Sequence, residues 1–96
     1  MNFNRELQNE IVQTILKYIK PKRIILFGSR ARGDSTRTSD IDLAIETEDD
    51  LLSLKEILDE EVSTLLKFDV VNLKKASDNL KTDILKEGIV IYEQES

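Results

Sequence analysis

The chain has 96 residues, of which 40% are hydrophobic and 34% charged, with one proline and three glycines. This size and composition indicate a single folded domain over residues 1–96 and exclude a disordered or fibrous chain. The absence of cysteine and histidine excludes disulfides, thiolate nucleophiles, imidazole bases and the common zinc sites. Any chemistry must therefore use carboxylates, hydroxyls, amines and the backbone.

Nothing in the sequence indicates export or insertion into a membrane. No stretch approaches the roughly 20 apolar residues of a membrane span. The first ten residues carry acids where a signal peptide would carry a basic and then an apolar run. A cytoplasmic location is therefore expected.

The formal net charge of −5 is unevenly distributed along the chain. Residues 22–37 carry a local charge of +4, which leaves −9 for the rest. An acidic chain lacks the broad basic surface that a long nucleic acid requires, so direct nucleic-acid binding is not expected. The short basic segment is better suited to a small anion.

The first half of the chain predicts a helix, a strand and a polar loop. Apolar residues at helical spacing predict a helix over residues 4–20, which Pro21 ends. The apolar and β-branched run Arg23–Phe27 predicts a buried strand that stops at Gly28. Residues 28–39 then form a polar segment whose first turn could be helical.

The rest of the chain continues this alternation of strands and helices. The expected elements are a strand at 40–46, an amphipathic helix at 49–66, a strand at 67–73, a helix at 77–86 and a strand at 89–92. Gly88 is a natural stop for the last helix. The pattern predicts an α/β (α+β) fold with a small mixed β-sheet of about four strands flanked by helices.

The polar segment after the first strand has the features of a phosphate-binding site. Gly28 permits close approach of the backbone, and Ser29 offers a hydroxyl and an amide at a predicted helix N-terminus, which favours anions. Arg30 and Arg32 add forked donors that match phosphate oxygens. Each feature alone is a weak signal, because a Gly-Ser pair is usually only a turn and a single arginine is most often a surface charge. Without histidine, Ser29 is not expected to be a hydrolase nucleophile.

Three aspartates are the candidate metal ligands. Asp40 and Asp42 are two residues apart on a predicted strand, so their carboxylates share a face and could share Mg²⁺ or Mn²⁺. Asp69 lies among apolar residues of the third predicted strand, where a lone acid is expected to be paired or to bind metal. If that strand neighbours the second, Asp69 completes a site for two-metal phosphoryl or nucleotidyl transfer and is the candidate general base. Taken singly, these acids could equally be solvated strand residues.

The pair Gly28-Ser29, then ten residues, then Asp-x-Asp, with a strand on either side, resembles the signature of the DNA polymerase beta-like nucleotidyltransferase superfamily. The resemblance is strongest to its minimal nucleotidyltransferases (MNT), which are often paired with HEPN proteins. It is strong over residues 21–46 and weaker for FDVVNL and EGIVIY. It implies the polymerase-beta-like fold and these roles: triphosphate binding by Gly28 and Ser29, supported by Arg30 and Arg32, and metal binding by Asp40, Asp42 and Asp69.

The resemblance also implies an activity, a cofactor and a partner. Such proteins transfer a nucleoside monophosphate, usually AMP from ATP, to a hydroxyl with the help of Mg²⁺, here with two ions expected. In MNT and HEPN pairs the MNT protein is typically an antitoxin, in some cases one that adenylylates a tyrosine of the HEPN ribonuclease toxin. Larger relatives carry a second domain that holds the acceptor, so here the acceptor is expected on a HEPN-type partner or a second copy, in a homo- or hetero-oligomer.

Two other functions stay open at this point. The chain could be a non-catalytic antitoxin that neutralises its partner by occlusion, since it has no acceptor lobe and an acidic remainder. It could also modify a small molecule or an RNA end, although the acidic balance is unfavourable for RNA.

Overall fold

The computed structural model describes residues 5–28, 40–62, 64 and 66–95. Its elements, in chain order, are α1 (Arg5–Tyr18), β1 (Arg23–Phe27), β2 (Ile41–Glu46), α3 (Leu54–Glu61), β3 (Phe68–Asn72), the 3₁₀ turn η1 (Leu73–Lys75), α4 (Asp78–Glu87) and β4 (Ile89–Glu93). The predicted alternation of helices and strands and the α/β (α+β) class are confirmed. The possible helical turn after Gly28 lies outside the described residues.

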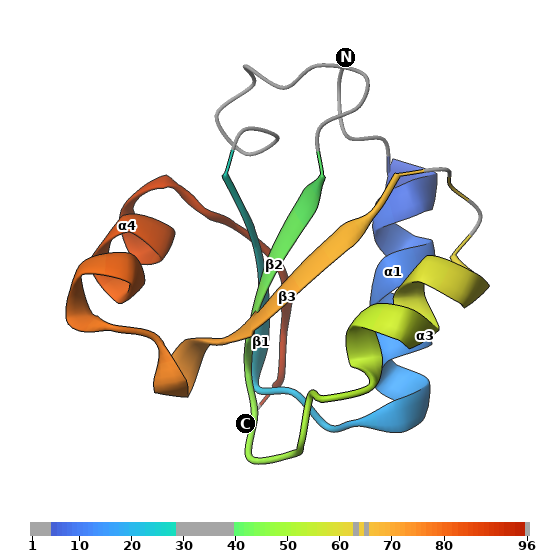
Figure 1. Cartoon of the computed structure of the whole chain (residues 1–96), viewed down its shortest axis with the longest axis horizontal. Coiled ribbons are helices and arrows are strands. Elements are labelled where there is room, and N and C mark those ends of the chain that lie inside the picture. Colours follow the sequence, from blue (N-terminus) through green and yellow to red (C-terminus); the bar gives the residue numbers. More distant parts are fainter. Residues whose placement is uncertain (1–4, 29–39, 63, 65, 96) are drawn as a thin grey trace.

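The four strands form one mixed sheet in the order β3-β2-β1-β4. β1 is antiparallel to both β2 and β4, whereas β2 and β3 are parallel and joined by a crossover that contains α3. Helices α1 and α3 lie on one face of the sheet and α4 on the other (Figure 1). None of the helices in the described part of the chain is long and apolar enough to cross a membrane.

The sheet separates two hydrophobic clusters of unequal size. In β2, the side chains of Ile41, Leu43 and Ile45 belong to the larger cluster, under α1 and α3. Ala44 belongs to the smaller cluster, together with Ile84 of α4. Side chains therefore alternate between the two faces of the sheet along β2.

Helix α3 is shorter than the predicted helix over residues 49–66. The residues before it form side-chain-capped turns: the Asp49 amide donates to Thr47 Oγ1 (3.1 Å), and the Leu52 amide donates to Asp50 Oδ1 (2.9 Å). Of the two amides, that of Leu52 is a backbone donor that a helix beginning at residue 49 would use, and here Asp50 takes it. At the other end, α3 stops at Glu61, and Val62 has an extended backbone.

Gly88 follows α4 as predicted, but for a different physical reason. Its φ of −75° is open to any residue, so no left-handed conformation is needed. A Cβ atom at this position would lie 2.4 Å from Ile25 Cγ2 and 2.4 Å from the Ile84 carbonyl oxygen. Glycine is required here because α4 ends in close contact with β1.

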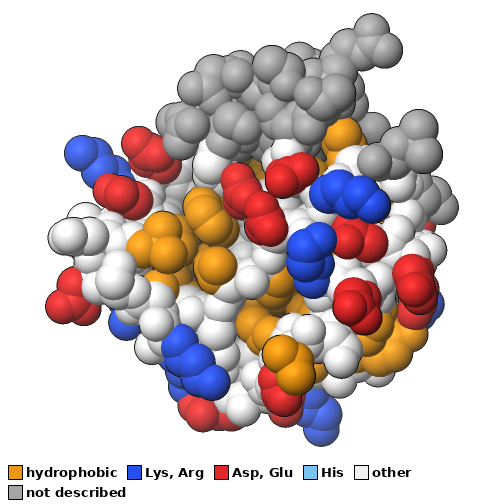
Figure 2. Space-filling view, viewed as in Figure 1, with side chains coloured by type: hydrophobic (Ala, Val, Ile, Leu, Met, Phe, Trp, Pro, Cys, Tyr) orange, Lys and Arg blue, Asp and Glu red, His pale blue; other side chains and the backbone are white. Residues whose placement is uncertain are grey.

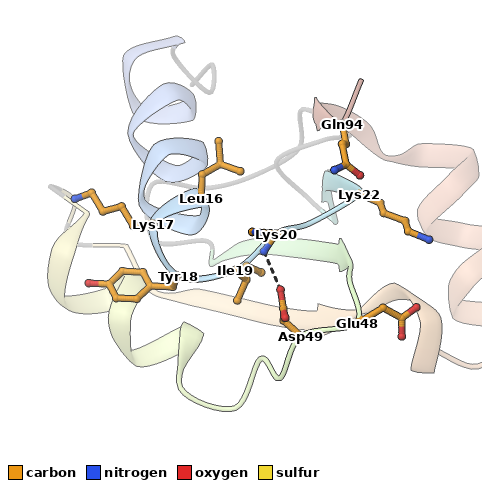
Figure 3. A pocket seen from close by; sticks show the side chains of 9 residues that line it. All are labelled: Leu16, Lys17, Tyr18, Ile19, Lys20, Lys22, Glu48, Asp49 and Gln94. Carbon is orange, nitrogen blue, oxygen red and sulfur yellow. Dashed lines mark hydrogen bonds between the residues drawn. The ribbon is translucent and has the colours of Figure 1, made fainter. Parts of the chain in front are cut away.

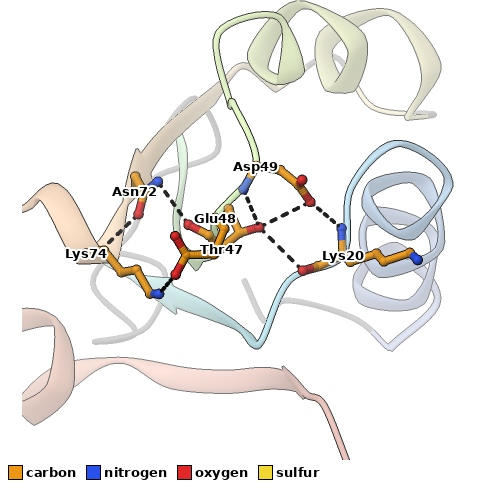
Figure 4. A network of polar contacts seen from close by, with 6 residues as sticks. All are labelled: Lys20, Thr47, Glu48, Asp49, Asn72 and Lys74. Atoms are coloured by element: carbon orange, nitrogen blue, oxygen red, sulfur yellow. Dashed lines mark hydrogen bonds and ion pairs between the residues drawn. The ribbon is translucent and has the colours of Figure 1, made fainter.

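A polar network centred on Thr47 connects three segments at one end of the sheet (Figure 4). Thr47 is only 1% exposed. Its hydroxyl accepts from the Asp49 amide, and the Asp49 carboxylate accepts from the Lys20 amide (2.8 Å). Asn72, the last residue of β3, donates to the Thr47 carbonyl (3.3 Å), while Lys74 pairs with Glu48. The network holds the ends of β2 and β3 and the segment after α1 together.

Replacing Thr47 by valine should lower the free energy of unfolding by about 1 kcal/mol, because the Asp49 amide loses its acceptor while the volume of the buried side chain at position 47 stays nearly unchanged. Urea denaturation would measure the change. The exposed Thr82→Val on α4 is the matched control and should have little effect. A Thr47→Val protein as stable as the wild type would contradict this role for the hydroxyl.

Candidate functional site

A row of three residues crosses the sheet at the end of β1. Asp42 is the backbone partner of Phe27 on β1 and of Asp69 on β3. By strand alternation, the Asp42 and Asp69 side chains lie on the face of Ala44, which is the face that α4 packs against. The sequence left open whether the strand with Asp69 neighbours the strand with Asp42. The structure shows that β3 is the neighbour of β2 and that Asp69 lies beside Asp42.

Asp40 was predicted to be the first residue of this strand, but it lies outside β2. The strand begins at Ile41, whose amide donates to the Lys67 carbonyl (2.9 Å), and Asp40 precedes it as an exposed residue. Asp69 is also exposed, whereas Asp42 is half-buried. The three acids therefore lie around the same end of the two parallel strands, with Asp42 the least accessible to solvent.

Gly28 provides the space that the Asp42 carboxylate occupies. Its φ is +79°, in the left-handed region that side chains other than glycine rarely adopt. A Cβ atom on this residue would lie 2.2 Å from Asp42 Oδ2 and 3.2 Å from Asp42 Cγ. The two halves of the Gly-Ser and Asp-x-Asp motif are thus in direct contact, although fourteen positions separate them in the sequence.

The donor chemistry of these acids suits a hard divalent cation, and the Gly28 turn leaves a cradle around the Asp42 carboxylate that a side chain would fill. Over residues 5–28, 40–62, 64 and 66–95, no three acidic side chains come close enough to hold one ion together. Ser29, Arg30 and Arg32 lie outside the described residues. The binding roles assigned to Gly28, to these three residues and to the aspartates stay predictions.

Two charged residues of α3 flank the start of β3 and were not singled out from the sequence. Lys55 Nζ lies 2.9 Å from Asp59 Oδ2, and Asp59 Oδ1 accepts from the Phe68 amide (3.0 Å). Burial opposes ionisation of Asp59, but the hydrogen bonds from Lys55 and Phe68, with the charges of Lys55 and Lys67, hold its pKa below the ordinary value. The spacing of four residues indicates the helical pair, but not its contact with β3.

Lys55 also interacts with two of the candidate metal ligands. Its hydrogen bond to Asp59 is the main cause of a raised pKa, which partial burial opposes. The negative charges of Asp69 and Asp40 raise the pKa further. Figure 2 shows acidic and basic side chains interleaved on this side of the molecule. The charges of Asp40 and Asp69 therefore reach a lysine on α3, the helix that packs on the other face of the sheet from Ala44.

A groove of about 510 Å³ lies at the opposite end of the sheet (Figure 3). Its lining residues come from the end of α1, the segment before β1, the segment after β2 and the end of the chain: Leu16, Lys17, Tyr18, Ile19, Lys20, Lys22, Glu48, Asp49 and Gln94. The strand register places Arg23 opposite Glu46 at this end and Phe27 opposite Asp42 at the other. The groove is therefore separate from the aspartates.

Gly28→Ala should lower the free energy of unfolding by at least about 1 kcal/mol, because alanine is strained at this φ and its methyl group meets the Asp42 carboxylate. In an Asp42→Ala background the same substitution should cost less, because the carboxylate is gone. Chemical denaturation of the four proteins gives both values. An equal loss in the two backgrounds would show that the methyl group does not meet Asp42.

The lowered pKa of Asp59 predicts a dependence of stability on pH. Its ionised form stabilises the fold above the ordinary aspartate pKa of about 3.9, and this contribution is lost as the pH falls through the lower pKa of the folded state. Between about pH 5 and pH 2, Asp59→Asn should therefore lose less stability than the wild type. The exposed Asp83→Asn on α4 is the control and should follow the wild-type curve.

Two curated proteins of Methanocaldococcus jannaschii are similar in sequence to this chain. One, MJ0435, carries the name of a candidate protein adenylyltransferase and is 35% identical over 94 residues, which cover 93% of this chain and 97% of that protein. The other, MJ0604, carries the same kind of name and is 40% identical over 81 residues, covering 74% of this chain and 78% of that protein. Both similarities extend well beyond the motif.

Solved structures with the same fold include toxin–antitoxin complexes. A chain from a toxin–antitoxin crystal structure with AMP-PNP superposes with a TM-score of 0.78 at 29% identity, over 92% of this chain and 74% of that one. A second comes from a complex of a tri-AMPylated Shewanella oneidensis HEPN toxin with an MNT antitoxin. Its TM-score is 0.72 at 26% identity, over 94% of this chain and 72% of that one. Residues 9–96 match the family described as Polymerase beta, Nucleotidyltransferase. The chain belongs to this nucleotidyltransferase family and has its polymerase-beta-like fold.

Proposed function

We propose that this chain is a Mg²⁺-dependent nucleotidyltransferase that transfers AMP from ATP to a hydroxyl of a HEPN-type partner. The proposed acceptor is the hydroxyl of a tyrosine, and the chain acts as the antitoxin of that pair. The observation that carries the proposal is the contact between Gly28 and Asp42, with Asp69 in register beside it. This geometry joins a turn suited to phosphate with acids suited to a divalent cation. The relatives named as candidate protein adenylyltransferases and the complex of an AMPylated HEPN toxin with an MNT antitoxin support the same activity.

In this proposal Gly28 and Ser29 bind the triphosphate, and Asp40, Asp42 and Asp69 hold two divalent cations between them. When bound, these cations would supply charge neutralisation at the phosphates and a lower pKa for the attacking hydroxyl. The hydroxyl oxygen forms a bond to the α-phosphorus, and the bond from that phosphorus to the bridging oxygen of the β-phosphate breaks, releasing pyrophosphate. Asp69 takes the hydroxyl proton, since it is exposed at the edge strand of the sheet.

The acceptor is proposed to come from another protein. The described elements form one sheet with its flanking helices, and the site lies at one end of that sheet. Residues 1–96 are proposed to be a single nucleotidyltransferase domain that works in the cytoplasm within a hetero-oligomer. The groove at the opposite end of the sheet is too far along the strands to belong to this site.

Asp42→Ala should abolish transfer of label from α-³²P-ATP to the HEPN-type product of the adjacent gene, while leaving the chain folded. Folding should survive because the substitution also removes repulsion between neighbouring carboxylates. Gel autoradiography with Mg²⁺ measures transfer, and circular dichroism checks the fold. The exposed Asp83→Ala on α4 is the matched control and should transfer label normally.

Two results would contradict the proposal. Asp42→Ala labelling its partner as well as the wild type would remove this carboxylate from the chemistry. A doubly substituted Asp40→Ala/Asp42→Ala chain that still neutralises the toxin would favour the non-catalytic antitoxin, which acts by occlusion.

A further inference from the structure

The Lys55–Asp59 pair lies where β2 and β3 begin. Asp59 holds the amide of Phe68, which directly precedes Asp69. Phe68 is in turn the backbone partner of Ile41, which directly follows Asp40. The pair is thus one residue away from two candidate metal ligands, on two adjacent strands.

The two members of the pair have opposite charges and separate contacts. The Lys55 side chain is 46% exposed and that of Asp59 is 18% exposed, so neither charge is fully screened by solvent. The attraction of Asp69 and Asp40 for Lys55, seen in its raised pKa, is mutual. The Lys55 ammonium neutralises part of the negative charge on these two acids. It therefore lowers their attraction for a metal cation.

We propose that Lys55 and Asp59 set the affinity of the carboxylate site for its divalent cation, Lys55 by weakening binding and Asp59 by strengthening it. This inference rests on the proposed function, because it assumes that the aspartates bind a metal. Both residues act through the electrostatic potential at Asp69 and Asp40 and do not themselves ligate the ion.

The alternative is that the pair only anchors α3 to the start of β3. The two roles predict different signs. If the pair is only an anchor, loss of either residue loosens the site and weakens metal binding. If the charges of the pair set the metal affinity, Lys55→Met leaves the negative charge of Asp59 uncompensated and tightens binding of the divalent cation. Asp59→Asn leaves the positive charge of Lys55 uncompensated and weakens that binding. Asparagine retains the oxygen that accepts from the Phe68 amide, so the anchor itself is kept.

The test is titration of the full-length chain with Mn²⁺ alone, followed by the electron paramagnetic resonance signal of the free ion. Lys55→Met should bind Mn²⁺ about two- to fivefold more tightly than the wild type, and Asp59→Asn more weakly by a similar factor. The double variant should return close to the wild type, and all differences should shrink in 1 M salt. Lys86→Met, which removes an exposed lysine on α4, should change nothing.

Weaker binding by both single variants, or unchanged binding by both, would overturn the inference. Lys55→Gln serves as a second variant if Lys55→Met does not fold by circular dichroism, and it carries the same expected sign. A wild-type chain that binds no Mn²⁺ would overturn this inference and the metal dependence of the proposed function together. Normal metal binding with no AMP transfer to the partner would count against the proposed function alone.

Discussion

The parallel pairing of β2 with β3 is the constraint on which the candidate site depends. Parallel neighbours cannot be joined by a tight turn, so the chain must cross over between them, and α3 occupies that crossover. The register from Ile41 opposite Phe68 to Ile45 opposite Asn72 then places Asp42 beside Asp69. A shift of this register by one residue would turn the Asp69 side chain to the opposite face of the sheet.

Two sets of polar contacts hold this register from its two ends. Near the end of the strands, buried Thr47 accepts from Asn72 through its carbonyl and connects to the segment after α1. Near their start, Asp59 holds the Phe68 amide at the outer edge of the sheet. An unpaired edge amide is a liability for an exposed strand, so one carboxylate both protects the edge and fixes the strand that bears Asp69.

The same face of the sheet carries apolar residues in one row and carboxylates in the next. Ile25, Ala44 and Val71 lie side by side across three strands and pack with α4, whereas the next row carries Asp42 and Asp69. Neighbouring carboxylates repel each other, so this row does not contribute to folding as the apolar row does. The fold thus takes its stability from the apolar row and places two neighbouring carboxylates in the adjoining row.

Local patterns in the sequence were enough to determine the order of helices and strands, the alternation of faces in β2 and the presence of a glycine turn before an Asp-x-Asp pair, because each depends on neighbouring residues. They overestimated the length of α3, since the Asp50 carboxylate takes the Leu52 amide that the longer helix would use. Only the tertiary structure decided the strand order, the contact of Gly28 with Asp42 and the placement of Lys55 and Asp59 beside β3. These features join residues distant in the chain, and their geometry follows from strand pairing and packing, which no local pattern specifies.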